Sequence, residues 1–311
     1  MTICYHIIAN MQAGSGNGKK TALLTEEYFI KHNIPFEIYQ TEYRNHAIEL
    51  IKGVLEKFNM SDRLLVIGGD GTLHEVISGL KEIKSDIPIG YLPAGTGNDF
   101  ARTIGLTSKL HHLLDEIVNA EVATSIECFV YHDKASDTHG VGLNSMGFGF
   151  DGTVIHLMDQ ETKPTSWLSK KMFSSWSYLA MVIDAFKNRK TFDVTVSVDG
   201  KEHQFSNVLI AGLMNHPYFG GGIKIDPEAK ANNQELAIMI IQNISFFMLL
   251  RLLPQVLTTG KHVNSSVFHR FPGKELSIKL HQASVGQVDG EPLPEAVYDM
   301  DYRLSSFNIW K

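Results

Sequence analysis

The chain has 311 residues, of which 43% are hydrophobic and 20% charged, and its net charge is −6. This length and composition predict a globular protein of two domains, and the negative charge argues against nucleic acid as a partner. The two cysteines, Cys4 and Cys128, have neither metal-ligand nor disulfide spacing, which indicates a reducing compartment. The N-terminus lacks a basic start, and no segment reaches the roughly 20 apolar residues that span a bilayer. We therefore expect a cytoplasmic protein that contacts a membrane only peripherally, at its inner face.

Strand and helix patterns alternate over the first third of the chain. The predicted strands are 3–9, 36–40, 64–67 and 87–92, and the predicted helices are 19–32, 46–58 and a run from Leu73. Such alternation predicts a three-layer α/β domain with a parallel sheet covered on both faces. Ligands of these sheets bind beyond the carboxyl ends of the strands. We expect three polar, glycine-rich loops to converge there: 10–18, 68–72 and 95–99.

Closely spaced strand patterns replace this alternation after about residue 122. They cover 125–132, 140–144, 192–198, 206–213, 235–241, 265–271, 276–280 and 283–288. This spacing predicts a mostly antiparallel β-sandwich, with Asp199-Gly200 as a hairpin turn. Two helices are expected within it, one over 166–187 and one from a Ser245 cap to Leu257. The apolar stripe of the first is typical of core packing, although Lys170 and Lys171 beside it leave a membrane-facing role open.

The segment 64–75 is the most informative part of the chain. An apolar strand pattern ends in Gly68-Gly69-Asp70-Gly71-Thr72, and a helical pattern follows. Such a turn directs backbone N–H groups and the positive end of a helix dipole to one point, which suits phosphate. A carboxylate beside phosphates needs a cation between them, so Asp70 indicates Mg²⁺.

Two further segments suggest the same chemistry. Gly95-Thr96-Gly97-Asn98-Asp99 precedes a short helix pattern that Asp99 is expected to cap. In a functional interpretation, Thr96 contacts phosphate and Asp99 contacts the metal or an acceptor hydroxyl. Far along the chain, 287–292 alone predicts only a hairpin turn. A carboxylate there, such as Glu291, could accept the proton of the acceptor hydroxyl in phosphoryl transfer.

Taken together, the motifs at 68–76, 93–102, 144–151 and 288–291 resemble the diacylglycerol-kinase catalytic family, soluble lipid kinases related to sphingosine kinases. They fall in the family's order and span nearly the whole chain. The resemblance implies transfer of the γ-phosphate of ATP, with Mg²⁺, to the hydroxyl of a lipid such as diacylglycerol. It also implies a domain formed by 1–124 with 296–311, and a β-sandwich lipid-substrate domain formed by 125–295.

The resemblance assigns roles to individual residues. Asp70 and Asp99 match an acidic pair that organises Mg²⁺–ATP and the acceptor, and Glu291 matches a general base. The implied nucleotide positions are Asn10, Thr41, Gly68, Gly69, Asp70, Gly71, Thr72, Gly95, Thr96, Gly97 and Asn98. A structural Mg²⁺ would fall at Lys230, Asn233 and Glu235, where Asn232 and Asn233 replace two carboxylates that are usual in the family.

Two alternatives to a lipid kinase remain open from the sequence. One is a kinase of a soluble acceptor such as NAD, since the first glycine motif also fits NAD kinases. The other is a nucleotide or lipid sensor that has kept the fold without catalysis. The sequence does not identify the lipid, and a homodimer stays open.

Overall fold

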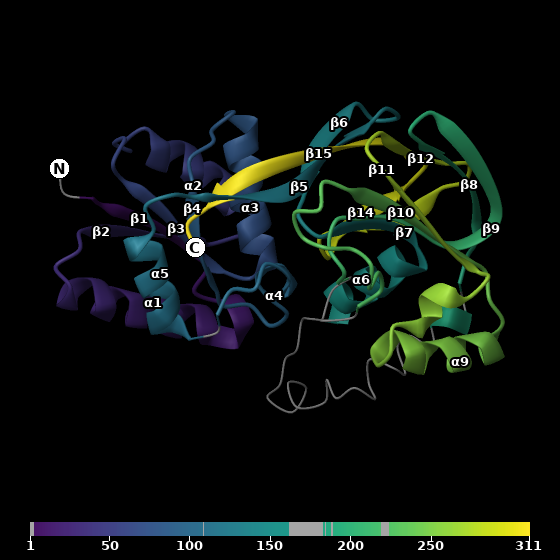
Figure 1. Cartoon of the computed structure of the whole chain (residues 1–311), viewed down its shortest axis with the longest axis horizontal. Helices are drawn as coiled ribbons and strands as arrows, with labels where there is room; N and C mark the ends of the chain where they lie inside the picture. Colours follow the sequence, from purple (N-terminus) through teal and green to yellow (C-terminus); the bar gives the residue numbers. More distant parts are fainter. Residues whose placement is uncertain (1–2, 108, 162–182, 184, 188, 219–223) are drawn as a thin grey trace.

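A computed structural model describes residues 3–107, 109–161, 183, 185–187, 189–218 and 224–311. A helix-covered α/β unit lies beside a unit made mostly of strands, as predicted (Figure 1). The helix expected over 166–187 lies almost entirely outside the described residues. Within the described ranges, no helix has both the length and the apolar character needed to cross a membrane.

The first unit is built on four parallel strands in the order β2-β1-β3-β4. The strands are β1 (Tyr5–Ala9), β2 (Phe36–Gln40), β3 (Arg63–Gly68) and β4 (Ile89–Pro93). The helices are α1 (Ala13–Lys31), α2 (His46–Leu55), α3 (Asp70–Glu82), α4 (Asp99–Thr103) and α5 (Leu110–Asn119). This confirms the predicted parallel sheet, and it adds α5, which was not predicted.

Side chains that alternate between the two faces of the sheet give the first unit its three layers, a helix layer on each side of the strands. Ile8 packs into one buried cluster with residues of α2 and α3, whereas its neighbour Ile7 packs into another with residues of α1 and α5. Successive side chains of a strand point to opposite faces, so each face of the sheet receives its own helices. The glycine loops are thereby held at the carboxyl edge of a rigid sheet.

The second unit is an antiparallel assembly. Its strands are β5 (Thr124–Asp133), β6 (Thr138–Gly142), β7 (Ser145–Gly149), β8 (Phe192–Val198), β9 (Lys201–Met214), β10 (Leu236–Gln242), β11 (Phe268–Gly273), β12 (Leu276–Leu280), β13 (Ser284–Val288), β14 (Glu291–Ala296) and β15 (Asp299–Ile309). Its helices are α6 (Phe150–Glu161), α9 (Phe246–Leu257) and a 3-10 helix (Lys261–Asn264). Asp199 and Gly200 have φ of +49° and +80°, as a tight hairpin requires. Ser245 caps α9 by accepting from the Met248 N–H at 3.3 Å.

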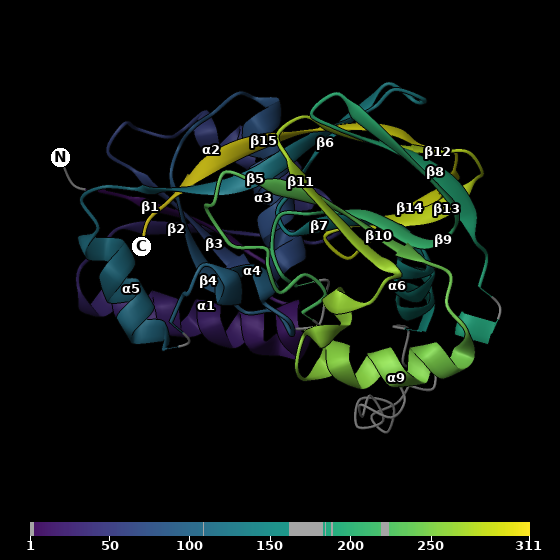
Figure 2. The same ribbon diagram turned by 45° about the vertical axis from the view of Figure 1, so that its right-hand side comes forward.

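The last strand joins the two units. β15 pairs with β5 from Met300 to Ile309 and forms a parallel bridge between Ile309 and Ile89 of β4. In Figures 1 and 2 this strand runs from the β-rich unit to the edge of the α/β sheet. The units therefore share one continuous hydrogen-bonded sheet, which fixes their relative placement.

Candidate active site

A cavity of about 400 Å³ opens at the carboxyl edge of the α/β sheet. It is lined by Asn10, Gln12, Ala13, Gly14, Thr41, Glu42, Tyr43, Arg44, Gly69, Gly71, Thr72, Glu75, Gly95 and Glu291. The first thirteen belong to the α/β unit, and Glu291 comes from β14 of the other unit. Seven predicted residues are thus brought together: Asn10, Thr41, Gly69, Gly71, Thr72, Gly95 and Glu291. Of the predicted nucleotide positions, Gly68, Asp70, Thr96, Gly97 and Asn98 are not among the lining residues.

The two glycine turns meet in backbone contact at this cavity. A Cβ on Gly95 would lie 2.6 Å from the Cα of Gly69, so only glycine permits the approach. Asn10 ties the first loop to the same place, because its Nδ2 donates to Thr72 Oγ1 at 3.2 Å. All three loops therefore line one hollow, next to the residues that begin α3.

Asp70 is held behind the turn rather than in the cavity wall. Its carboxylate accepts from the backbone N–H of Asp99 at 2.9 Å and of Phe100 at 3.3 Å. Asp70 therefore satisfies the first N–H groups of α4. Burial raises the pKa of Asp70 to about 6, and the neighbouring charges of Asp99 and Asp289 add to the rise against the two hydrogen bonds. A cation beside this carboxylate would relieve that cost.

The predicted capping role of Asp99 is wrong. Asp99 is the first residue of α4, so the capping position falls to Asn98, whose side chain makes no capping hydrogen bond. The capping oxygens come from Asp70, 29 residues earlier. Asp99 is buried and ion-paired with Arg102, whose Nη2 also donates to the carbonyl of Gly97 at 3.1 Å.

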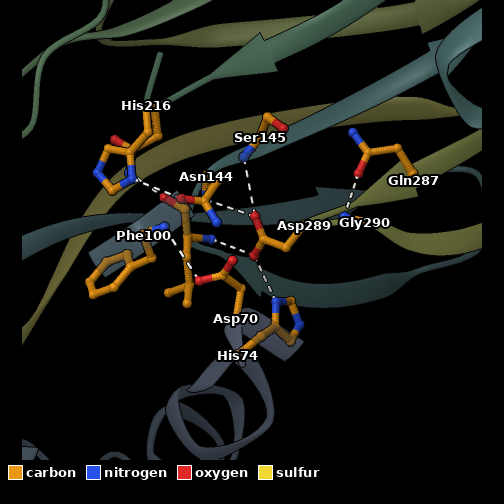
Figure 3. Close-up of polar contacts among 11 residues, drawn as sticks. Asp70, His74, Phe100, Asn144, Ser145, His216, Gln287, Asp289 and Gly290 are labelled. Carbon is orange, nitrogen blue, oxygen red and sulfur yellow. Dashed lines mark hydrogen bonds and ion pairs between the residues drawn. The ribbon is translucent and has the colours of Figure 1, made fainter. Parts of the chain in front are cut away.

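Asp289 links the two units at the back of the site, as Figure 3 shows. Its fully buried carboxylate accepts from His74 Nδ1 of α3 at 2.7 Å. It also accepts from the backbone N–H groups of Leu143 at 2.6 Å, Asn144 at 2.7 Å and Ser145 at 3.1 Å. Burial alone would raise the pKa of Asp289, but the bond and charge of His74, with these N–H donors, hold it below its ordinary value. The resemblance implied nucleotide positions over the segment 68–74, which includes His74, whereas we did not predict Asp289 as a site residue.

The turn after Asp289 carries Glu291 to the cavity. Asp289 and Gly290 have φ of +51° and +84°, and Gln287 Oε1 accepts from the Gly290 N–H at 2.8 Å. Glu291 forms an ion pair with Arg44, which follows β2 at the same edge of the sheet. Glu291 Oε1 also lies near the start of α3, 3.2 Å from where a Cβ on Gly71 would stand.

A buried histidine extends this network. His216 Nδ1 lies 3.0 Å from Asn144 Oδ1, and its ring is 5.7 Å from that of Phe100 in α4. Burial lowers the pKa of His216 to about 4 against the opposing charge of Asp289. The ring is therefore neutral near pH 7, and it packs between the units without adding charge.

The residues implied for a structural Mg²⁺ do not fit a metal. Glu235 Oε1 is 3.1 Å from Arg270 Nη1, and the same guanidinium lies 2.9 Å from Asp226 Oδ2. The Asn233 side chain accepts from the Glu235 N–H at 3.3 Å. The Arg270 guanidinium thus already pairs with the carboxylates that a metal ion would need as ligands. None of these residues lines the cavity.

Comparison with known proteins identifies both units. Residues 5–128 match the family described as "Diacylglycerol kinase catalytic domain", and 145–305 match "YegS C-terminal NAD kinase beta sandwich-like domain". The chain is 27% identical over 299 residues to "Putative lipid kinase YtlR" of Bacillus subtilis, covering 92% of this chain and 93% of that protein. It is 26% identical over 240 residues to "Putative lipid kinase SA0681" of Staphylococcus aureus, covering 77% and 74%.

Solved structures share the fold. One is titled "Crystal structure of a putative diacylglycerol kinase from Bacillus anthracis str. Sterne", with a TM-score of 0.71 and 19% identity over 99% of this chain and 94% of that one. Another, of a diacylglycerol kinase from the same organism, has a TM-score of 0.67 and 17% identity over 99% and 96%. The chain belongs to the family in which a diacylglycerol kinase catalytic domain is followed by a YegS-type, NAD kinase-like β-sandwich.

Proposed function

We propose that this protein transfers the γ-phosphate of ATP, with Mg²⁺, to the hydroxyl of a lipid such as diacylglycerol. One observation carries the proposal: two glycine turns and a carboxylate from the other unit line the same cavity. The catalytic-domain family and the lipid-kinase names of the relatives support it. A lipid acceptor would require peripheral contact with a membrane, which we place at its cytoplasmic face.

The polyphosphate would lie across the two turns. Backbone N–H groups at Gly69 and Gly71, with the positive end of α3, would hold it, while Asn10 and Thr72 offer side-chain donors. When bound, Mg²⁺ would neutralise phosphate charge. Asp70 suits Mg²⁺ as a partner, because a cation would offset the burial and the nearby charges of Asp99 and Asp289 that raise the pKa of its half-buried side chain. We assign the buried Asp99 to the same acidic pair.

Glu291 would act as the general base. It takes the proton of the acceptor hydroxyl, whose oxygen bonds to the γ-phosphorus as the bond from that phosphorus to the bridging oxygen of ADP breaks. Its ion pair with Arg44 must first loosen. Arg44 is the cationic side chain among the described residues that line the cavity, so nucleotide phosphates would draw it away from Glu291 and leave the carboxylate available.

A panel of acceptors tests the proposal. Purified protein is incubated with Mg²⁺ and γ-labelled ATP on vesicles of total lipid extract, on diacylglycerol, on a long-chain base and on NAD, and labelled products are identified. Label in a lipid that disappears with Glu291→Gln supports the proposal. Label in NAD alone would support a soluble acceptor, and the absence of transfer to any acceptor despite nucleotide binding would support a sensor.

A further inference from the structure

A second cluster of chemically active side chains lies on the β5–β6 hairpin, apart from the cavity. Strand pairing sets His132 of β5 directly opposite His139 of β6, and directly opposed side chains share one face of the sheet. Asp137 stands in the connecting turn with φ of +54°. None of the three lines the candidate active site, so the proposed kinase chemistry leaves this cluster unexplained.

The three side chains bring nitrogen and oxygen ligand atoms together. The imidazole rings of His132 and His139 stack with centroids 4.0 Å apart and planes within 6°. Asp137 Oδ1 lies 2.9 Å from His132 Nε2 and 3.9 Å from His139 Nε2. One ligand atom from each residue lies within 4.8 Å of the others. The hydrogen bond between Asp137 and His132 at 2.9 Å accounts for one ring only, since His139 Nε2 lies 3.9 Å from the same carboxylate oxygen.

The base of the hairpin is rigid. The buried Asp133 accepts from Ser136 Oγ at 2.6 Å and from the Ala135 N–H at 3.1 Å within the turn. It also accepts from the Asp299 N–H of β15 at 3.0 Å. β5 is in turn paired along its whole length with β15. The backbone that carries the ligands is therefore preorganised, which lowers the cost of binding.

We infer that His132, His139 and Asp137 form a site for a divalent transition metal of the zinc class. Two imidazoles and one carboxylate are a ligand set that such ions prefer, and water would complete the coordination. The nearest cation along the chain, Lys134, lies 3.0 Å from Asp301 and 3.1 Å from Asp299. Its charge is thus balanced and does not repel a bound ion.

Binding requires one small rearrangement. Parallel stacked rings do not aim their nitrogen lone pairs at a common point, so one ring must turn toward the other. The His139 side chain is 70% exposed and can turn without displacing core atoms, whereas His132 is 34% exposed. The hairpin backbone need not move.

Zinc titration of the full chain tests the site. Isothermal calorimetry is run at pH 7.5 with Zn²⁺ in excess Mg²⁺, which prefers oxygen ligands and does not compete. The variants are His139→Gln and Asp137→Asn, since Asn tolerates the left-handed backbone at residue 137. The matched control is His112→Gln, because His112 is an exposed histidine that pairs with Glu116 on α5 at 3.2 Å.

We expect wild type and His112→Gln to bind one Zn²⁺ with the same affinity. His139→Gln and Asp137→Asn should each weaken that binding at least ~10-fold. With Zn²⁺ absent, all four proteins should melt alike, which separates loss of a ligand from loss of the fold. Equal affinity in wild type, His139→Gln and Asp137→Asn would overturn the inference, whatever the acceptor panel shows about the kinase.

Discussion

Asn in place of Asp289 would set an amide group against donors that now share a carboxylate. Asp289 Oδ1 accepts from the N–H groups of Asn144 and Ser145, and Oδ2 accepts from Leu143 N–H and His74 Nδ1. An amide has only one acceptor oxygen. Whichever way it turns, its NH₂ group therefore faces two buried donors.

The size of the effect follows from these contacts. A hydrogen bond to a charged group contributes about 1.5–3 kcal/mol, and removing one partner of a buried ion pair costs about 3–5 kcal/mol. We expect Asp289→Asn to lower the free energy of unfolding by about 3–5 kcal/mol. In a chain of 311 residues that melts as one unit, this corresponds to a Tm lower by roughly 5–8 °C.

The pH dependence gives a second measurement. Because the native pKa of Asp289 is below that of the unfolded chain, the unfolded state binds protons more readily. The stabilisation is complete above the unfolded pKa of about 4 and is lost as pH falls through the native pKa. The difference in Tm between wild type and Asp289→Asn should therefore be largest near pH 7 and shrink below pH ~4.

A surface carboxylate provides the control. Asp301 is partly exposed and forms an ion pair with the exposed Lys134, so Asp301→Asn should change stability by less than about 1 kcal/mol. Calorimetric melting and urea unfolding measure both variants. A Tm for Asp289→Asn within the range of Asp301→Asn would refute the view that Asp289 holds the two units together.

Three further substitutions test the proposed chemistry. Glu291→Gln should lower kcat by about 10²–10⁴ with an unchanged Tm, whereas Glu295→Gln on the same strand should not; near-wild-type turnover would remove Glu291 as the base. Asp70→Asn should weaken Mg²⁺–ATP binding in calorimetry without unfolding the protein, and an unchanged affinity would refute its metal role. Gly95→Ala should abolish tight ATP binding and cost about 1–3 kcal/mol of stability, because its Cβ meets the opposite turn. Gly53→Ala, where a Cβ meets nothing within 4 Å, should do neither, and equal behaviour of the two would contradict the contact.

The sequence was sufficient to predict the sheet and the meeting of its loops. Strict alternation of strand and helix leaves one parallel architecture, and parallel strands place their carboxyl ends at one edge. Strands 192–198 and 276–280 were predicted to the residue. The same argument could have predicted Arg44 as a site residue, because it follows the carboxyl end of β2 at that edge.

Other features depend on contacts that periodicity does not contain. β14 was not predicted, because 287–292 was interpreted only as a hairpin turn. The strand carries Pro292 and Pro294 and ends the strand order as an edge strand, where proline is tolerated. From the sequence alone, Asp289 is predicted only to be a turn residue. Its partners at 143–145 are about 145 residues earlier, and only tertiary folding brings their N–H groups to its carboxylate.

Helix α3 explains how a residue so late in the chain can serve a site built by the first third. The glycine turn that begins α3 lies at the cavity, and one turn along the same helix His74 donates to Asp289. Asp289 in turn begins the tight turn that delivers Glu291. The same helix therefore positions both the phosphate-binding turn and, through Asp289, the proposed base Glu291. A substitution at Asp289 should disturb both stability and turnover, whereas one at Glu291 should affect turnover alone, so the two roles can be separated experimentally although the residues are two positions apart.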